Sequence, residues 1–396
     1  RRGIRIRLGR RQHAYARKIP GALLAFAPSV EIGRLCIRSD FGSTQRQIIK
    51  NIALFITRHS PRIALSLSCM VLIAAAALGV VGGNELRYPD ESDYIQLAQS
   101  VRSGEGYLGP EGTPTAYRPP GWPLVLSVLY SFHPHPLTAK LFNALAYACV
   151  AWLLSLAVAR IVPQGRVFAP LLLLLYPAGV YTTSTLYPQT LGTLLLVVVL
   201  HLLHERERGV LKSVLAGILF GVLVLSIPAF LLLAPLIIIG LFLTRSPESP
   251  RPALHATLFL LCAVLVVAPW TLRNARVFDR FIPVSTNSGV NLLLGNSENS
   301  GPNKGVNVDI AHYIEEADGL REDDKDAYYK KCALTWMRDH PGAAVKLYAL
   351  KVLNYFNFRN ELFVKSEASR MRDLVLATWY YPLLLIAVIR LLVYRT

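Results

Sequence analysis

Long apolar segments, separated by short polar ones, recur along most of the chain. A helix needs about 20 mostly apolar residues to cross a bilayer. The segments that approach or reach this length are Ile63–Val81, Leu137–Ala159, Val167–Val180, Leu186–Leu203, Leu211–Ser226, Phe230–Leu243, His255–Trp270 and Leu374–Leu392. The pattern predicts an all-α polytopic membrane protein with about eight transmembrane helices.

A shorter apolar segment, Gly121–Phe132, contains only about twelve residues. This length fits a helix that lies in the membrane interface better than one that crosses the bilayer. If the N-terminus is inside and the other helices alternate, two long polar segments, 84–136 and 272–372, lie outside. The Lys and Arg residues of the short loops then fall mostly inside, as the positive-inside rule requires.

This topology predicts four parts. We expect residues 1–62 to form a basic cytoplasmic segment that is partly disordered. Residues 63–271 form the transmembrane core and include the outer loop 84–136, with its interfacial helices. Residues 272–372 form a small outer, periplasmic module, and residues 373–396 form the last transmembrane helix.

Positive charge is concentrated near the N-terminus. The chain is 53% hydrophobic and carries a net charge of +17, which in a soluble protein would suggest nucleic-acid binding. However, residues 1–62 hold fourteen Lys and Arg residues against Glu31 and Asp40. A basic block before the first span indicates orientation and contact with anionic lipid, so we expect no nucleic-acid partner. The five cysteines show neither metal-site spacing nor a clear disulfide pairing.

Candidate chemistry lies in the outer segments, because the predicted spans contain almost no ionisable residues. A transporter coupled to ions or protons would need such residues along its pathway. Three carboxylates, in Asp90-Glu91-Ser92-Asp93, follow the first span directly. They fit either the capping of a helix or a general base at the membrane surface.

Three further polar motifs each allow two interpretations. Arg118, in the Tyr-Arg-Pro-Pro motif at 117–120, can bind a phosphate through its forked guanidinium or extend to lipid headgroups. Arg273, at the outer end of a predicted span, can bind an anion or bond to helix carbonyls. The segment from Ser285 to Asn296 is rich in Asn, Ser and Gly, which recognise hydroxyls but also form plain turns.

Several of these motifs follow one another in a recognisable order. Asp-Glu-x-x-Tyr from Asp90 precedes a Gly-rich turn and Arg-Pro-Pro-Gly-Trp-Pro-Leu from Arg118. Pro-Trp-x-x-Arg-Asn from Pro269, Ser-Thr-Asn-Ser-Gly from Ser285 and His-Pro-Gly from His340 come later. In this order, over residues 63–392, the chain resembles the glycosyltransferase-C superfamily. It is most similar to bacterial relatives of the dolichyl-phosphate-mannose–protein mannosyltransferases and of the lipid A aminoarabinose transferases.

The resemblance implies an enzyme of the bacterial inner membrane with its active site on the periplasmic side. Its donor would be a polyprenyl-phosphate-linked sugar, transferred with inversion to an acceptor protein, lipid or glycan. The catalytic pair carries over to Asp90 and Glu91, with Asp90 the general base, and the donor phosphate would contact Arg118 and Arg273. The remaining expected substrate contacts are Tyr94, Tyr117, Gln189, Asn274, Asn287 and Asn291.

Two departures from the family pattern matter. Tyr117 stands where the aminoarabinose transferases have an acid, which argues against a divalent metal ion there. Gln189 stands where many bacterial members have Glu, so this position is expected to contact substrate only. The sequence therefore indicates no definite cofactor, and it leaves a divalent metal ion open although Tyr117 argues against one.

Three other functions remain open on sequence grounds. A flippase or transporter of lipid-linked sugars would line several spans with polar residues. A glycan ligase or polymerase would place Arg and His in a late outer loop, where Arg273, His312 and His340 occur. A non-enzymatic scaffold would use the acids and arginines only as caps. The enzyme hypothesis requires Asp90 and Arg118 to face one site.

Overall fold

The computed structural model describes residues 43–204, 209–243, 251–357 and 370–393. The chain divides into a large unit, Ile56–Leu383, and a small one, Arg1–Phe55 with Leu384–Thr396. The described part of the small unit consists of the beginning of α2 (Ser43–Val81) and the end of α16 (Arg370–Val393). Most of the predicted basic segment therefore lies outside the described residues, although from Ser43 onward the chain is helical.

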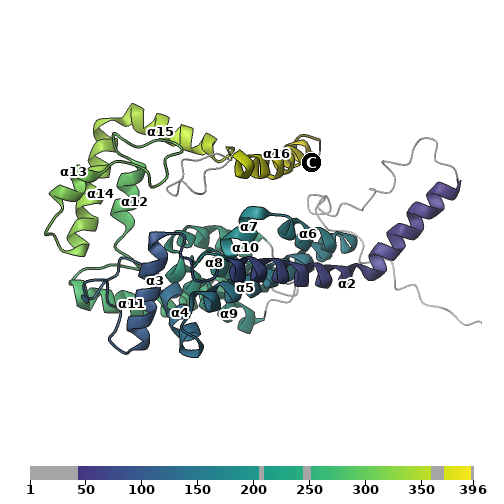
Figure 1. Cartoon of the computed structure of the whole chain (residues 1–396), viewed down its shortest axis with the longest axis horizontal. Helices are drawn as coiled ribbons and strands as arrows, with labels where there is room; N and C mark the ends of the chain where they lie inside the picture. The colour runs from purple at the N-terminus through teal and green to yellow at the C-terminus, as the bar shows by residue number, and fades with distance from the viewer. Residues whose placement is uncertain (1–42, 205–208, 244–250, 358–369, 394–396) are drawn as a thin grey trace, which may run out of the picture. The chain divides into compact units, whose positions relative to one another are not determined.

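Four described helices are long and apolar enough to cross a membrane (Figure 1). They are Thr57–Val81 of α2, α5 (Pro136–Ile161), α11 (Pro252–Phe278) and α16. A fifth span would consist of η2 (Pro163–Val167) and α6 (Phe168–Leu174) together with α7 (Pro177–Thr183), which is bent from them by 65°. The protein is thus a helical membrane protein, but the eight predicted spans are not confirmed.

The remaining predicted spans form helices that are shorter than a bilayer crossing normally requires. They form α8 (Gln189–His204), α9 (Val210–Ser226), and η3 (Pro228–Leu233) followed by α10 (Ala234–Leu243). The sixteen residues of α8 extend over only about 24 Å, less than the apolar thickness of a bilayer. Prolines account for several boundaries, because proline lacks an amide donor and clashes with the preceding helical turn. Pro177 and Pro228 open new helices, and Pro188 directly precedes α8.

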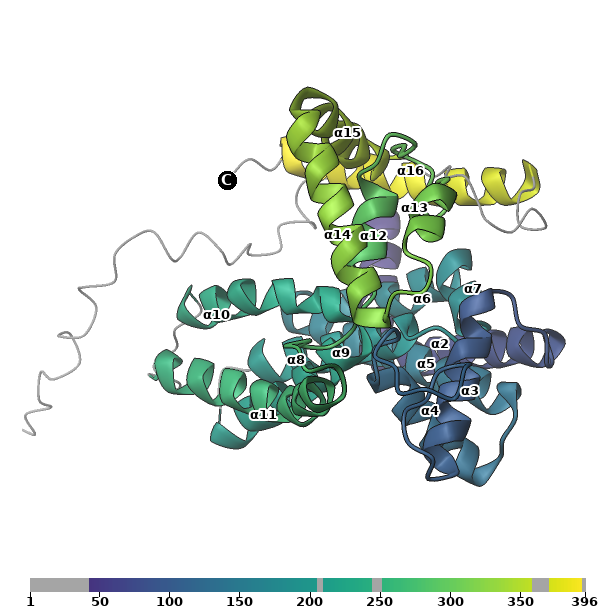
Figure 2. The same ribbon diagram turned by 90° about the vertical axis from the view of Figure 1, so that its left-hand side faces the viewer.

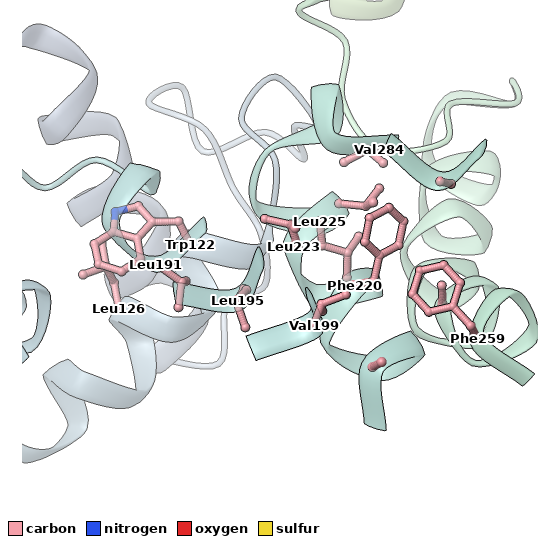
Figure 3. Close-up of a cluster of buried hydrophobic side chains, with 14 of the residues drawn as sticks. Trp122, Leu126, Leu191, Leu195, Val199, Phe220, Leu223, Leu225, Phe259 and Val284 are labelled. Atoms are coloured by element: carbon pink, nitrogen blue, oxygen red, sulfur yellow. The ribbon is translucent and has the colours of Figure 1, made fainter. Parts of the chain in front are cut away.

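The main core lies where four helices of the large unit meet (Figure 3). These are α8, α9, α11 and the twelve-residue helix α4 (Gly121–Phe132), which matches the predicted short helix. Fully or almost fully buried side chains at this junction include Trp122, Leu126, Leu191, Leu195, Val199, Phe220, Leu223 and Phe259. The indole nitrogen of Trp122 donates a hydrogen bond to the carbonyl of Leu186 at 2.6 Å. This contact fixes α4 beside the segment that leads into α8.

Glycines allow α9 and α11 to approach closely. A Cβ atom at Gly217 would lie 2.4 Å from the carbonyl oxygen of Phe259, and one at Gly221 would lie 2.6 Å from the Cβ of Val266. Gly217 and Gly221 are four residues apart, so both are on the same face of α9. Two small residues at this spacing are typical of tight helix pairs in membranes, where close backbone packing drives association.

The late polar segment forms a helical module with a core of its own. Its helices are α12 (Ser288–Gly295), α13 (Ala311–Glu316), α14 (Glu322–Asp339) and α15 (Pro341–Asn354). Figure 2 shows α12 and α14 side by side. Gly289 allows this approach, since a Cβ there would lie 2.0 Å from the carbonyl of Asp326. The buried apolar residues between these elements are Leu293, Val308, Ile310, Ala317, Tyr329 and Ala333.

Candidate active site

The candidate acids lie at the beginning of α3 (Pro89–Arg102), directly after the first span. Pro89 occupies the first helical position, where its missing amide hydrogen costs nothing, and Asp90 and Glu91 fall in the first turn. Carboxylates at this position interact favourably with the helix dipole. Asp93 is three residues after Asp90, so the two carboxylates lie on the same face of α3.

Arg118 connects these two carboxylates. Its Nη2 lies 2.7 Å from Oδ1 of Asp90 and 2.8 Å from Oδ2 of Asp93, and its Nε donates to the same Asp93 oxygen at 3.1 Å. The hydroxyl of Tyr187 donates to the other oxygen of Asp90 at 2.9 Å. We call Asp90, Asp93, Arg118 and Tyr187 the acid–arginine cluster. Three segments that are distant in the sequence thus meet at one point.

Aromatic rings surround the guanidinium of Arg118. It lies 4.9 Å from the ring centroid of Tyr117 and 5.7 Å from that of Tyr94, a range in which a cation is attracted to the ring face. Burial lowers the pKa of Arg118, but the hydrogen bond that it donates to Asp93 and the negative charge of Asp90 outweigh this effect and raise the pKa. Arg118 therefore remains protonated at any physiological pH.

The tyrosines of the cluster region remain neutral. Burial raises the pKa of Tyr94 to about 12. Burial and the neighbouring Asp90 carboxylate also raise the pKa of Tyr187. Because both phenols keep their protons, Tyr187 acts as a hydrogen-bond donor to Asp90 and not as a base.

The cluster borders an open hollow of about 740 Å³. Asp93 and Tyr117 line it together with the loop of residues 109–115 and the beginning of α14. The side chains of Asp90 and Asp93 are 36% and 33% exposed, whereas that of Arg118 is 15% exposed. The carboxylates are thus accessible from outside, and the cation beside them is largely shielded from water.

Glu91 does not share the environment of Asp90. Its side chain is completely buried, and its two oxygens accept hydrogen bonds from the amides of Arg87 at 2.9 Å and Leu186 at 3.1 Å. Burial raises the pKa of Glu91, and the two backbone hydrogen bonds partly oppose this. The predicted catalytic pair is therefore divided. Asp90 belongs to the cluster, while Glu91 attaches the first turn of α3 to the segment that carries Tyr187.

Arg273 bonds to backbone carbonyls of the first outer loop. Its guanidinium donates to the carbonyls of Thr115 at 2.7 Å and Tyr107 at 3.1 Å, and it lies 4.8 Å from the ring centroid of Trp270. The buried Asn274 donates to the carbonyls of Ile282 and Val284. Both residues thus hold the backbone of the outer loops, whereas the resemblance implied contacts with donor and substrate.

The other predicted contact residues form local hydrogen bonds. Gln189 is exposed at the beginning of α8. The side-chain oxygen of Asn287 accepts from Ser285, and the exposed Asn291 donates to the carbonyl of Asn287. Among the predicted residues, the structure joins Asp90, Arg118, Tyr94 and Tyr117. Tyr187 was not predicted, and Asp93 was named only as one of the three carboxylates that follow the first span.

Glu322, at the beginning of α14, connects the late module to the loop that carries Arg118. Its oxygens accept from the hydroxyls of Thr115 and Thr286, both at 2.5 Å, and from the amide of Ala116 at 2.8 Å. The amide of Thr286 in turn donates to the carbonyl of Ala116 at 3.0 Å. Both Glu322 and Thr286 therefore hold the backbone just before Tyr117 and Arg118.

Within the described residues, no group of three or more His, Cys, Asp and Glu side chains could hold a metal ion. Searches of protein-family models, curated proteins and solved structures found no match to this chain. The function must therefore be inferred from the geometry of the acid–arginine cluster and its surroundings.

Proposed function

We propose that the protein is a membrane glycosyltransferase that uses a polyprenyl-phosphate-linked sugar as donor and acts on the extracytoplasmic face. The observation that carries this proposal is the position of Arg118 between Asp90 and Asp93, beside an open hollow. A buried, permanently charged guanidinium suits a lipid phosphate. A neighbouring exposed carboxylate suits a general base.

The transfer would proceed in one displacement. The acceptor hydroxyl attacks the anomeric carbon, the bond between that carbon and the phosphate oxygen breaks, and Asp90 takes the hydroxyl proton. The transition state resembles an oxocarbenium ion, as in other glycosyl transfers. The lipid phosphate leaves as an anion, so no acid is needed to protonate it.

Arg118 would exchange partners during binding. In the structure its Nη2 contacts both Asp90 and Asp93. A donor phosphate would replace Asp90 as the partner of the guanidinium, while Asp93 keeps the side chain in place through Nε. This exchange frees an Asp90 oxygen for the acceptor proton. Arg118 then stabilises the charge that develops on the leaving phosphate.

The fold is compatible with a glycosyltransferase-C architecture of about eight spans. That number results if α8, α9, the η3–α10 pair and the bent α6–α7 pair each cross the bilayer in addition to the four long helices. In this arrangement α4 would be the interfacial helix of the first outer loop. The hollow beside Asp93 would admit the acceptor.

A transporter is less well supported. Lys140 is the buried cation near one end of the candidate span α5, and its amine donates to the carbonyls of Gly83 at 2.8 Å and Glu85 at 3.0 Å. Its hydrogen bonds therefore hold the end of α2. A residue used in this way does not suggest an ion pathway.

The proposal can be tested with purified protein in lipid vesicles. Labelled polyprenyl-phosphate hexoses and pentoses would serve as donors, and a crude envelope fraction would supply acceptors. We expect release of polyprenyl phosphate and transfer of label by the wild type, and a loss of about 10²–10⁴-fold for Asp90→Asn. Glu111→Gln is the matched control, because Glu111 lines the same hollow outside the cluster. Donor binding without turnover in the wild type would contradict the proposal and favour a carrier function.

A further inference from the structure

One side of helix α15 packs against the rest of the late module, and its other residues are exposed. On the packed side, Leu347 is buried and the amine of Lys351 donates to the carbonyl of Gly295. These two contacts fix the rotation of α15 about its axis. They anchor it to the module formed by α12 and α14.

Beside the packed side, exposed apolar residues form a continuous surface, which we call the α15 stripe. Its members follow one another at intervals of three or four residues along the helix and continue beyond its end, which places them on one face. They are Val345, Tyr348, Val352, Tyr355 and Phe356, and their exposed fractions are 71%, 71%, 42%, 81% and 55%. Apolar and aromatic surface of this extent marks an interaction site.

The position of α15 in the chain indicates a membrane as its partner. The next described element is the candidate span α16. The hydroxyl of Tyr380 in α16 donates to the carbonyl of Tyr355, at the end of the stripe, at 2.5 Å. Tyr380 lies within the aromatic group Trp379-Tyr380-Tyr381, about 10 Å beyond Asp373 along the helix. The end of the stripe therefore lies against the first half of the candidate span α16.

The charge around the stripe also fits a lipid surface. Residues 327–357 contain Lys330, Lys331, Arg338, Lys346 and Lys351 but only one acid, Asp339. An amphipathic helix with aromatic and aliphatic residues on one face and lysines beside it is typical of binding in the interface of anionic membranes.

We propose that α15 lies in the membrane interface, with the α15 stripe in the lipid and Lys346 at the headgroups. A helix of this kind is buried by about 5–10 Å in the interface. The contact holds the module of α12–α14 at a fixed height over the bilayer. Because Glu322 connects this module to the loop of Arg118, the hollow beside the cluster stays close to the membrane. The proposal does not depend on the transferase function.

The test compares two positions that are two residues apart on opposite sides of α15. Val345 belongs to the stripe, and Ala343 is also exposed but faces away from it. Each would carry a single cysteine with an environment-sensitive nitrobenzoxadiazole label, in full-length protein whose five native cysteines are replaced. The protein would be reconstituted in phosphatidylcholine–phosphatidylglycerol vesicles, after its elution is shown to match that of the wild type.

We expect the label of Val345→Cys to emit at shorter wavelength, to be quenched by nitroxide lipids and to be protected from iodide. The label of Ala343→Cys should be quenched by iodide and not by the lipids. Val352→Cys provides a second stripe position and should behave like Val345→Cys. Equal iodide quenching at all three positions would place the stripe in water. Protection of Val345 and Val352 from both quenchers would show that protein covers them, and either result would overturn the proposal.

Discussion

Replacement of Glu322 by alanine should release the loop that carries Arg118 from the late module. The Glu322 carboxylate accepts three hydrogen bonds, from the hydroxyls of Thr115 and Thr286 and from the amide of Ala116. A hydrogen bond to a charged group contributes about 1.5–3 kcal/mol, and partial replacement by water keeps the total well below the sum of three. We expect the local opening free energy of this loop to fall by about 3 kcal/mol.

Hydrogen–deuterium exchange of the loop measures this effect directly. A loss of about 3 kcal/mol corresponds to roughly 100-fold faster exchange, and the change should appear in peptides that cover residues 113–118. The amide of Tyr117 should respond as well, because it donates to the hydroxyl of Thr115 at 3.0 Å. Glu111→Ala, an exposed acid of the same loop, should leave exchange unchanged. Unchanged exchange in the Glu322→Ala protein would refute the reasoning that this carboxylate holds the loop.

Three further predictions concern the pH dependence, the helix packing and the cation. Because burial raises the pKa of Glu91 above 4.5, the native state binds this proton more tightly than the unfolded chain, so stability should fall as pH rises through the folded pKa. Glu91→Gln should remove this slope from thermal unfolding curves between about pH 4 and pH 8, and an identical slope would contradict the assignment. Gly217→Ala should lower the free energy of unfolding by about 1–3 kcal/mol, because its Cβ meets the carbonyl of Phe259 at 2.4 Å. Gly240→Ala should not lower the free energy of unfolding, because there is open space at its Cβ. If denaturant titrations give the same loss for both variants, the packing argument is wrong. Arg118→Lys should lower kcat by about 10²-fold, since an ammonium cannot reproduce the forked contacts; wild-type kcat in steady-state assays would remove Arg118 from the mechanism.

Apolar segments in the sequence identified the helical membrane class and the positions of the helices, but not how many cross the bilayer. The four longest helices agree with predicted spans, as does the short helix Gly121–Phe132. The other predicted spans form helices that are short or, at Pro177, bent. Apolar composition alone does not show where a proline ends one helix and starts the next.

The candidate site was predictable only in part. Asp90 and Arg118 were both expected in it, and helical spacing from Asp90 would also have indicated Asp93. Tyr187 and Glu322 carry no comparable local pattern, because their partners Asp90 and Thr115 lie 97 and 207 residues away. The different environments of the neighbouring Asp90 and Glu91 likewise depend on which face of α3 meets the segment at Leu186, and this requires the tertiary structure.

The most direct test of the central claim is turnover of a labelled polyprenyl-phosphate sugar by Asp90→Asn, Arg118→Ala and the double variant. If the two residues act in the same displacement, their effects are not additive, as for other catalytic groups that work as a unit. We predict that each single variant loses most of the activity and that the double variant is no slower than the slower single one. Turnover at the wild-type rate in the Asp90→Asn protein, or losses that multiply fully in the double variant, would contradict a single site built from Asp90 and Arg118.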